Sequence, residues 1–342
     1  MSDPRPACLV TNVVSPYREE PFRLLCEAED VDVIAWEHEG APTQLGAVRL
    51  AASGRYRAVI CGMSGRVALP GSFLAARRAR VPFVLWATIW SHPQTLAHAL
   101  SWLPMRQIYR RADAVATYGP HISEYVAERR GSADDVFVAT QAAAPLHLAP
   151  ARPAARADER PLFLFVGRFE SEKGIDVLLE AWRRSGLAGE AELVFVGEGP
   201  LRSRIESAGM GVSVRGALPA AELPPLYASA SAVVLPSIRT RTFVEPWGLV
   251  TNEAMHQGTP VVASDAVGAV AGGLVRDGRN GLVFPAGDAG ALATRLATLA
   301  RNGELRAALG RAAQADAAGY TPYAWAAGMR QALAAAGAGR PS

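Results

Sequence analysis

Apolar and polar positions in the first half of the chain follow two alternating patterns. Short uninterrupted apolar runs predict buried strands at residues 7–14, 31–36, 58–61, 81–87 and 114–117. Stretches with apolar residues at helical spacing follow them, around residues 20–29, 73–79, 94–111 and 121–130. Apolar strands that alternate with helices are typical of a parallel sheet covered on both faces. This half of the chain therefore predicts an α/β domain.

The second half repeats the pattern after a break. Residues 142–160 are rich in Ala, Pro and Arg without periodicity, which predicts a linker. Beyond it, strands are predicted at residues 162–166, 192–196, 212–215, 232–236, 260–264 and 281–284. Helices are predicted at residues 174–184, 200–208, 249–257, 289–301 and 304–317. We expect two Rossmann-like parallel-sheet domains, residues 1–150 and 151–319.

The last segment, residues 320–342, predicts a helix that carries Tyr320, Tyr323, Trp325 and Met329. Such large apolar side chains are usually buried, so the segment is expected to pack back on the N-terminal domain. Ligands of open α/β folds bind at the carboxyl ends of the strands. We therefore expect the site in a cleft between the two domains.

Composition narrows the class of protein. A length of 342 residues suits two domains, and 50% hydrophobic with 20% charged residues is typical of a soluble globular enzyme. The net charge of +3 is too small to predict a nucleic-acid partner. The cysteines at positions 8, 26 and 61 form no C-x-x-C pair, which indicates a reducing compartment.

The beginning of the chain lacks a basic region followed by an apolar core, so no signal peptide is predicted. No apolar run approaches the roughly 20 residues that span a bilayer. The expected location is the cytoplasm. A peripheral contact with the inner face of a membrane stays open but unsupported, since arginine pairs such as Arg110-Arg111 are typical of solvated helix faces.

Two carboxylates in FVEPWGLVTNEAM stand out by their setting. Glu245 and Glu253 are eight residues apart, a separation that also occurs between unrelated glutamates of this chain. Pro246 and Gly248 allow a helix to begin only near Gly248, which places Glu245 in the preceding loop and Glu253 about one turn inside. Backbone N–H groups at such a helix start suit a phosphate. The alternative for Glu253 alone is a carboxylate that only offsets the helix dipole.

A second segment, FVGRFESEKGI, places two cations after a strand. Arg168 and Lys173 follow the strand end at Gly167 and precede a helix. Arginine grips phosphate with two hydrogen bonds, and lysine adds a point charge. Two ordinary surface cations are the alternative. The spacing of a Walker phosphate loop is absent.

Both segments resemble the signature of family 4 glycosyltransferases, which have the GT-B fold. The stretch FVGRFESEKGIDVLLEAW is similar to the first strand, loop and helix of their C-terminal domain. The stretch FVEPWGLVTNEAMHQGTPVVASDAVGA resembles their E-x7-E region, and LVFVGEGP and LVRDGRNGLVFPAGD resemble the remaining blocks. The match covers roughly residues 160–300 and occurs in the same order. The N-terminal half is similar only through TNVVSPYREEPF.

The resemblance implies a role for each matching residue. Arg168 and Lys173 would contact the diphosphate of a nucleotide sugar and stabilise the leaving group. Glu253 would bind the ribose, and Glu245 the donor sugar near the reacting carbon. Further donor contacts would come from the backbone of Trp247, Gly248, Leu249 and Val250 and, beside the base, from Arg215 and Gly216.

The resemblance further implies transfer with retention of configuration and without a divalent metal. The sequence has no D-x-D cluster after a strand, so no metal or cofactor site is predicted. In place of the family's Gly-Gly pair, the first loop has Ser15-Pro16-Tyr17-Arg18. Arg18 is the residue there that could approach phosphate, and the alternative is that this loop faces the acceptor. His92 is placed to contact the donor sugar, and His121 is the alternative candidate for that contact.

The leading interpretation is a retaining, metal-independent glycosyltransferase that moves a sugar from a nucleotide-diphosphate sugar to an acceptor hydroxyl. The acceptor is open among a small-molecule glycoside, a lipid-linked saccharide and an envelope polysaccharide. A nucleotide-sugar epimerase of the same fold is the alternative, and so is a non-catalytic nucleotide-sugar-binding protein. Conversion of a nucleotide sugar without acceptor would favour the epimerase.

Overall fold

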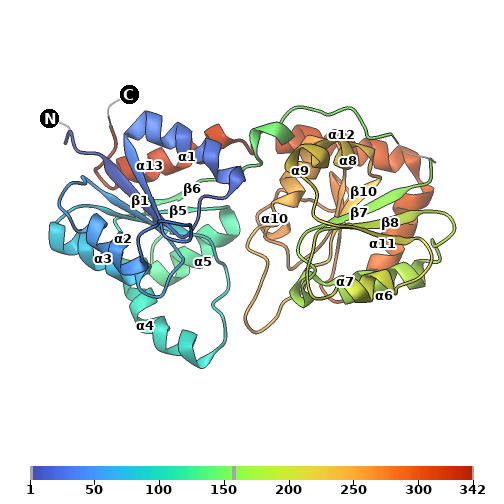
Figure 1. Cartoon of the computed structure of the whole chain (residues 1–342), viewed down its shortest axis with the longest axis horizontal. Helices are drawn as coiled ribbons and strands as arrows, with labels where there is room; N and C mark the ends of the chain where they lie inside the picture. Colours follow the sequence, from blue (N-terminus) through green and yellow to red (C-terminus); the bar gives the residue numbers. More distant parts are fainter. Residues whose placement is uncertain (1–2, 156–158, 341–342) are drawn as a thin grey trace. The chain divides into compact units, whose positions relative to one another are not determined.

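The computed structural model describes residues 3–155 and 159–340, with the backbone alone for residues 96–100. It divides into two compact units (Figure 1). Unit 1 combines Met1–Ala144 with Tyr320–Ser342, and unit 2 is Pro145–Gly319. The sequence predicted a division after residue 150. Part of the predicted linker, residues 156–158, lies outside the described residues.

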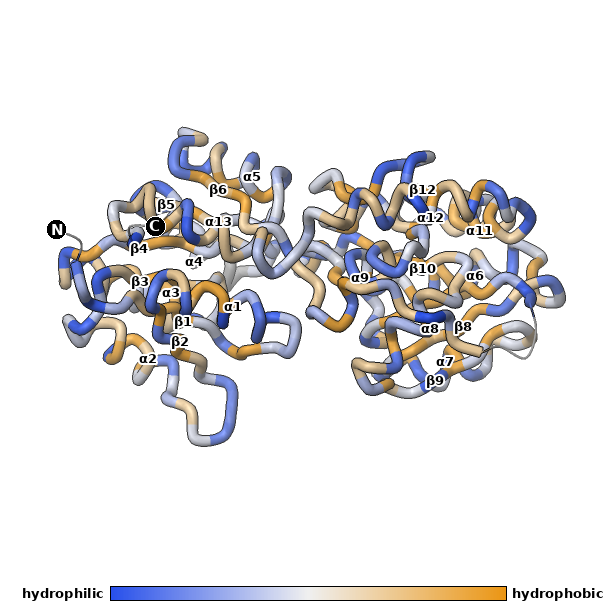
Figure 2. Tube along the Cα trace, turned by 90° about the horizontal axis from the view of Figure 1, so that it is seen from above, coloured by the Kyte–Doolittle hydropathy of each residue, from blue (hydrophilic) through white to orange (hydrophobic). Residues whose placement is uncertain are grey.

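A parallel six-stranded sheet forms the centre of unit 1. Its strand order is β2-β1-β3-β4-β5-β6. The bounds are β1 Ala7–Thr11, β2 Val31–Ala35, β3 Val59–Gly62, β4 Phe83–Ala87, β5 Ala114–Thr117 and β6 Val136–Val138. Strands β1, β3, β4 and β5 are buried along their whole length, as their apolar runs predict (Figure 2).

The helices of unit 1 form two groups. Helices α2, α3, α4 and α5 pack in sequence against one another, and α1 packs against α13. Their bounds are α1 Pro16–Glu29, α2 Gln44–Ala51, α3 Ala68–Ala79, α4 Leu96–Arg111, α5 Pro120–Arg130 and α13 Pro322–Ala335. Figure 1 shows α13 beside α1 although they come from opposite ends of the chain.

Helix α13 joins unit 1 through aromatic packing. The Trp325 ring lies 5.4 Å from the rings of both Phe22 and Trp86. Thr321 caps the helix by accepting the N–H of Ala324 at 3.2 Å. These contacts explain why the C-terminal segment carries more large apolar residues than an exposed tail would.

A buried charge cluster fixes the residues that follow α13. Glu29 is 1% exposed, and its carboxylate accepts from Arg330 Nε at 3.0 Å and from the Arg340 backbone N–H at 2.8 Å. Arg57, also buried, donates to Glu29 Oε2 at 3.3 Å and to the carbonyl of Ala338 at 2.9 Å. Opposite charges that are taken out of water together need such partners.

Unit 2 contains a second parallel sheet, with strand order β12-β11-β10-β7-β8-β9. The bounds are β7 Leu162–Val166, β8 Glu192–Val196, β9 Val212–Arg215, β10 Ala232–Leu235, β11 Val261–Ser264 and β12 Gly281–Phe284. Val166 pairs with Val196, and Val196 pairs with Arg215, so these strands end together. Their following loops therefore share one edge of the sheet.

Three short helical turns and several helices surround this sheet. The 3-10 turns are η1 Pro145–His147, η2 Ser171–Lys173 and η3 Ala220–Glu222. The helices are α6 Ile175–Ser185, α7 Arg202–Glu206, α8 Leu223–Ser229, α9 Val250–His256, α10 Gly268–Ala271, α11 Ala289–Arg301 and α12 Gly303–Ala317. Helices α6 and α11 pack side by side over one hydrophobic core.

The segment that enters unit 2 is anchored by hydrogen bonds. The side-chain amide of Gln257 donates to the carbonyl of His147 at 2.6 Å, and its oxygen accepts from Ala151 N–H at 2.7 Å. Ala154 N–H donates to the carbonyl of Pro225 at 3.0 Å. The described part of the Pro- and Ala-rich segment, which the sequence predicts to be a linker, therefore runs along the surface of α8 and α9.

The structure adds four elements that the sequence did not predict and moves the start of one predicted helix. Helices α2, α8 and α10 and strand β6 were not predicted. Helix α1 begins at Pro16 rather than near residue 20, because a proline fits the first helical position. None of the helices in the described part of the chain is both long and apolar enough to cross a bilayer.

Candidate functional site

The loops after β7 and β10 bring Lys173 and Glu245 together at the carboxyl edge of the unit 2 sheet. Lys173 Nζ donates to Glu245 Oε2 at 2.5 Å. Ser237 Oγ donates to the same oxygen at 3.0 Å. Lys173 Nζ also lies 5.2 Å from the centre of the Phe243 ring. Glu245 is 8% exposed, so this charge-assisted hydrogen bond fixes the direction of a largely buried carboxylate.

The loop after β7 positions Lys173 through a tight approach of two backbones. Lys173 ends the turn η2, and Gly174 follows with φ of +72°. A Cβ at Gly174 would collide with the carbonyl of Pro236, so only glycine permits this contact. Ile238 N–H donates to the carbonyl of Glu172 at 3.0 Å. The loop after β7 is therefore held directly against the loop after β10.

The loop after β10 positions Glu245 through the start of α10. Glu245 forms a parallel bridge with Val267, and its carbonyl accepts from Gly268 N–H at 3.1 Å. A Cβ at Gly268 would collide with the carbonyl of Pro246. Ala269 N–H donates to the carbonyl of Trp247 at 2.8 Å. The conformation of residues 245–247 is thus set by backbone contacts on both sides.

The residues between the two glutamates support helix α9. The Trp247 side chain is 2% exposed, and its Nε1 donates to Asn252 Oδ1 at 2.7 Å inside the unit. Gly248 has φ of +88°, and Leu249 occupies the position before the helix that begins at Val250, without a side-chain cap. Trp247 can therefore offer a ligand its backbone, because its indole ring is in the core.

Glu253 lies on α9 in a polar cluster of its own. Its Oε2 accepts from Tyr227 Oη at 2.6 Å, and its Oε1 lies 3.8 Å from His147 Nε2. Burial raises the pKa of the Glu253 carboxyl above its usual value, although the Tyr227 hydrogen bond opposes the shift. Burial and the charge of His256 lower the pKa of His147 to about 4. At neutral pH the neutral His147 ring therefore adds no positive charge beside Glu253.

The other predicted donor residues of unit 2 lie on neighbouring loops. Arg168 is exposed, and one guanidinium nitrogen lies 3.7 Å from Glu172 Oε1. Arg215 is exposed at the end of β9, and its carbonyl accepts from Gly197 N–H at 3.2 Å. Gly216 lies against the side chain of Glu198. The structure thus joins Lys173 to Glu245 directly, whereas Arg168, Arg215 and Gly216 occupy the same sheet edge without contacting that pair.

The predicted residues of unit 1 have partners within that unit. Arg18 donates to Tyr118 Oη at 2.8 Å, and its guanidinium carbon lies 4.6 Å from the centre of the Trp86 ring. The His92 ring lies 5.1 Å from the Trp102 ring. His121, the alternative candidate, is buried against Trp90, with ring centres 5.2 Å apart. Their roles toward a donor stay predictions.

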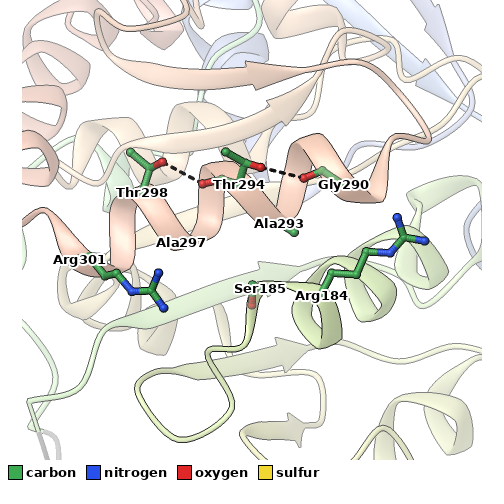
Figure 3. A pocket seen from close by; sticks show the side chains of 8 residues that line it. All are labelled: Arg184, Ser185, Gly290, Ala293, Thr294, Ala297, Thr298 and Arg301. Atoms are coloured by element: carbon green, nitrogen blue, oxygen red, sulfur yellow. Dashed lines mark hydrogen bonds between the residues drawn. The ribbon is translucent and has the colours of Figure 1, made fainter.

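A depression in unit 2 lies apart from these residues (Figure 3). It runs between α6 and α11 and is lined by Arg184, Ser185, Gly290, Ala293, Thr294, Ala297, Thr298 and Arg301. The hydroxyls of Thr294 and Thr298 donate to backbone carbonyls of their own helix. Across the described residues, no group of three or more His, Cys, Asp or Glu side chains could hold a metal ion.

Residues 151–316 match the family model described as "Glycosyl transferases group 1". Residues 151–316 therefore form a domain that resembles this family. The match corresponds closely to unit 2 and includes every unit 2 residue that the sequence places in the donor site. The resemblance to family 4 glycosyltransferases is thereby confirmed.

Two curated relatives show how far the likeness extends along this chain. Sulfoquinovosyl transferase SQD2 from Arabidopsis thaliana is 34% identical over 170 residues, which are 47% of this chain and 31% of that protein. The GDP-mannose-dependent alpha-mannosyltransferase of Mycobacterium tuberculosis is 32% identical over 233 residues, 64% of this chain and 57% of that protein. The matched part thus spans only about a third to somewhat over half of these relatives.

A solved structure confirms the GT-B fold of this chain. HepE from Anabaena, crystallised in complex with UDP-glucose, superposes with a TM-score of 0.73 at 20% identity. The superposition covers 96% of this chain and 99% of that one. The predicted fold class, with two Rossmann-like parallel sheets, is therefore correct.

Sequence reasoning missed three side chains that shape the candidate site in unit 2. Ser237 directly follows Pro236 after β10, so its place at the carboxyl end of a strand could have identified it. Tyr227 and His147 carry no such signal. They reach Glu253 from α8 and η1, across long separations in sequence.

Proposed function

We propose that this chain transfers a sugar from a nucleotide-diphosphate sugar to an acceptor hydroxyl with retention of configuration. The observation that carries the proposal is the Lys173–Glu245 pair at the carboxyl edge of the unit 2 sheet. It joins the two segments that carry the family resemblance. Ligands of parallel α/β sheets bind at this edge.

The donor would bind through charges that unit 2 already holds in place. Arg168 is exposed and free to turn toward a diphosphate, since its 3.7 Å contact with Glu172 is a weak surface pair. The Lys173 ammonium has three hydrogens and can contact phosphate while it keeps Glu245 as partner. Glu253 would accept from ribose hydroxyls, and backbone N–H groups at residues 248–250 would face phosphate. The complex of HepE with UDP-glucose supports a nucleotide sugar as the ligand class.

The chemical step would break the bond between the anomeric carbon and the diphosphate oxygen. The acceptor oxygen forms its bond on the same face of the sugar, and its proton passes to the departing diphosphate. Arg168 and Lys173 would stabilise the charge of the diphosphate as it leaves. Glu245 would stabilise the positive charge that develops near the anomeric carbon. We propose that these residues suffice without a divalent metal.

The acceptor would be bound by unit 1, where Arg18, His92 and His121 lie near the ends of the strands. A small-molecule glycoside, a lipid-linked saccharide and an envelope polysaccharide remain candidates. All three cysteines are free thiols, which favours a reducing compartment such as the cytoplasm.

Thermal melting against nucleoside diphosphates and nucleotide sugars, without metal, tests the donor site. A ligand at 100 times its dissociation constant adds about 2.7 kcal/mol to the free energy of unfolding. We expect a shift with one base, lost in Arg168→Ala and kept in the control Arg183→Ala on α6. No shift with any nucleotide, in a sample that melts cooperatively, would contradict the proposed donor site.

Incubation with the donor that shifts the melt distinguishes transfer from isomerisation. Conversion of the nucleotide sugar into its epimer in the absence of acceptor would identify an epimerase. Release of the nucleoside diphosphate only when an acceptor is present is the result that we expect.

A further inference from the structure

The charges of unit 1 are distributed unevenly along the sequence. Residues 40–112 contain ten arginines and no aspartate, glutamate or lysine, whereas the whole chain has a net charge of only +3. Nine of these arginines are exposed, and Arg57 alone is buried. The segment includes helices α2, α3 and α4, which pack in sequence on one another. Six of the ten arginines lie on these three helices, which therefore concentrate positive charge.

Large apolar side chains are exposed on the same helices. Leu74 on α3 is 64% exposed and Leu103 on α4 is 68% exposed, and both expose more than Leu45 at 49% and Leu50 at 40% on α2. A leucine side chain exposed to this extent contributes little hydrophobic stabilisation to its own unit. Of the nine large hydrophobic residues that are exposed in the described chain, five belong to this segment.

The spacing places leucine and arginine on the same helix faces. Leu74 is followed by Arg77 and Arg78, three and four residues on, and Leu103 by Arg106 and Arg110, three and seven residues on. Residues at these separations lie on one side of a helix. We name the surface of Leu74, Arg77 and Arg78 on α3, with Leu103, Arg106, Arg110 and Arg111 on α4, the α3–α4 face.

Contacts between the helices make this a continuous surface. Arg77, Arg110, Arg111 and Arg130 line one shallow depression. Arg77 is held there by Asp113, at 3.1 Å, and by the carbonyl of Arg111. Within the described residues, the guanidinium groups of Arg78, Arg110 and Arg111 have no hydrogen-bonding or ionic partner. Several positive charges are therefore available to an external anion.

We propose that the α3–α4 face docks unit 1 on an anionic lipid bilayer. Arginines beside exposed leucines match the two layers of such a surface, anionic headgroups and the apolar region beneath them. A nucleic acid would engage the arginines but would leave the leucines in water, so a bilayer fits the face better. The inference is independent of the donor site, which lies in unit 2.

Co-sedimentation with phosphatidylcholine vesicles, with and without 40% phosphatidylglycerol, tests the proposal. Each arginine near an anionic surface contributes about fivefold in partitioning. We therefore expect Arg78→Gln/Arg110→Gln/Arg111→Gln to lower binding to the anionic vesicles about a hundredfold. The matched control Arg183→Gln/Arg184→Gln/Arg311→Gln removes the same charge from unit 2 and should bind as the parent does.

A second pair of variants tests the apolar part. Leu74→Ser/Leu103→Ser should weaken binding by at least about tenfold, and the exposed Met210→Ser of unit 2 should not. Thermal melting of each variant confirms that it is folded. Absence of binding to anionic vesicles at low salt would overturn the proposal. So would equal losses in the arginine variants of both units, or tighter binding to single-stranded RNA that is unaffected by the leucine changes.

Discussion

Lys173 and Glu245 share a 2.5 Å hydrogen bond although 72 residues separate them in sequence. Each residue is fixed by its own loop, Lys173 through Gly174 and Glu245 through its bridge with Val267. The pair therefore connects two loops that were assigned to one site only by family resemblance. It also means that neither side chain can be replaced without an effect on the other.

Replacement of either partner should abolish most of the turnover. Glu245→Gln keeps a hydrogen-bond acceptor for Ser237 but removes the charge, and Lys173→Ala removes a cation from the leaving group. We expect each to lower the turnover number by about 100- to 1000-fold, the range for loss of one preorganised electrostatic contact. The double variant should be little worse than either single one.

Initial rates with saturating donor measure these effects, and Glu180→Gln on the exposed side of α6 is the control. Circular dichroism should show that the variants are folded. Full activity of both single variants would remove the pair from the proposed site.

Tyr227 should act by holding Glu253 in place. Tyr227→Phe removes the 2.6 Å hydrogen bond and leaves the packing of the ring unchanged. The loss of one hydrogen bond to a carboxylate is worth about 1.5–3 kcal/mol. We expect nucleoside diphosphate binding to weaken about tenfold or more, with a smaller change in the turnover number at saturation. Calorimetric titration measures the affinity for the nucleoside diphosphate, and the exposed Tyr323→Phe is the control.

His147 should make the free energy of unfolding depend on pH. Its pKa falls from 6.5 to about 4 in the folded protein because of burial and of His256. Between these values the unfolded chain binds a proton that the folded chain does not, so acid favours unfolding. The stabilisation by the neutral ring is complete above about pH 6.5 and is lost as the pH falls toward 4.

Melting temperatures from pH 7 to 4 check this dependence. The decline should be shallower in His147→Gln, which removes the titrating ring. An identical slope in the variant and the parent would show that other groups cause the decline.

Removal of divalent metal should leave the activity unchanged. The proposed step relies on Arg168 and Lys173 for the charge of the leaving group. We therefore expect the same initial rate in excess EDTA as in added Mg²⁺. A large loss in EDTA that Mg²⁺ or Mn²⁺ restores would contradict metal-independent transfer.

Several largely buried strands could be predicted from the sequence alone. Residues 114–117, 162–166, 192–196 and 281–284 were predicted with the bounds that the structure shows, because an apolar run bounded by polar or turn residues has few alternatives. Helix α8 contains Pro224 and Pro225 near its start, and β6 has only three partly exposed residues. Neither carries a periodic signal of sufficient length.

The residues of the candidate site could be predicted where a single loop after a strand supplies them. Arg168, Lys173 and Glu245 follow strand ends, a place that itself indicates function. Ion pairs between distant loops depend on how the strands are ordered in the sheet. Here β7 lies between β8 and β10, an order that local patterns do not specify. The Lys173–Glu245 contact and the Tyr227–Glu253 contact therefore required the structure.

Helix α13 makes unit 1 discontinuous, and this has a consequence for synthesis on the ribosome. Trp325 completes the aromatic cluster with Phe22 and Trp86, and Arg330 and Arg340 complete the partners of Glu29. Domains usually fold in the order in which they are made. Here all of unit 2, Pro145–Gly319, emerges before the last part of unit 1. The second unit of the nascent chain therefore becomes complete first, and the first must wait for translation to reach its final helix.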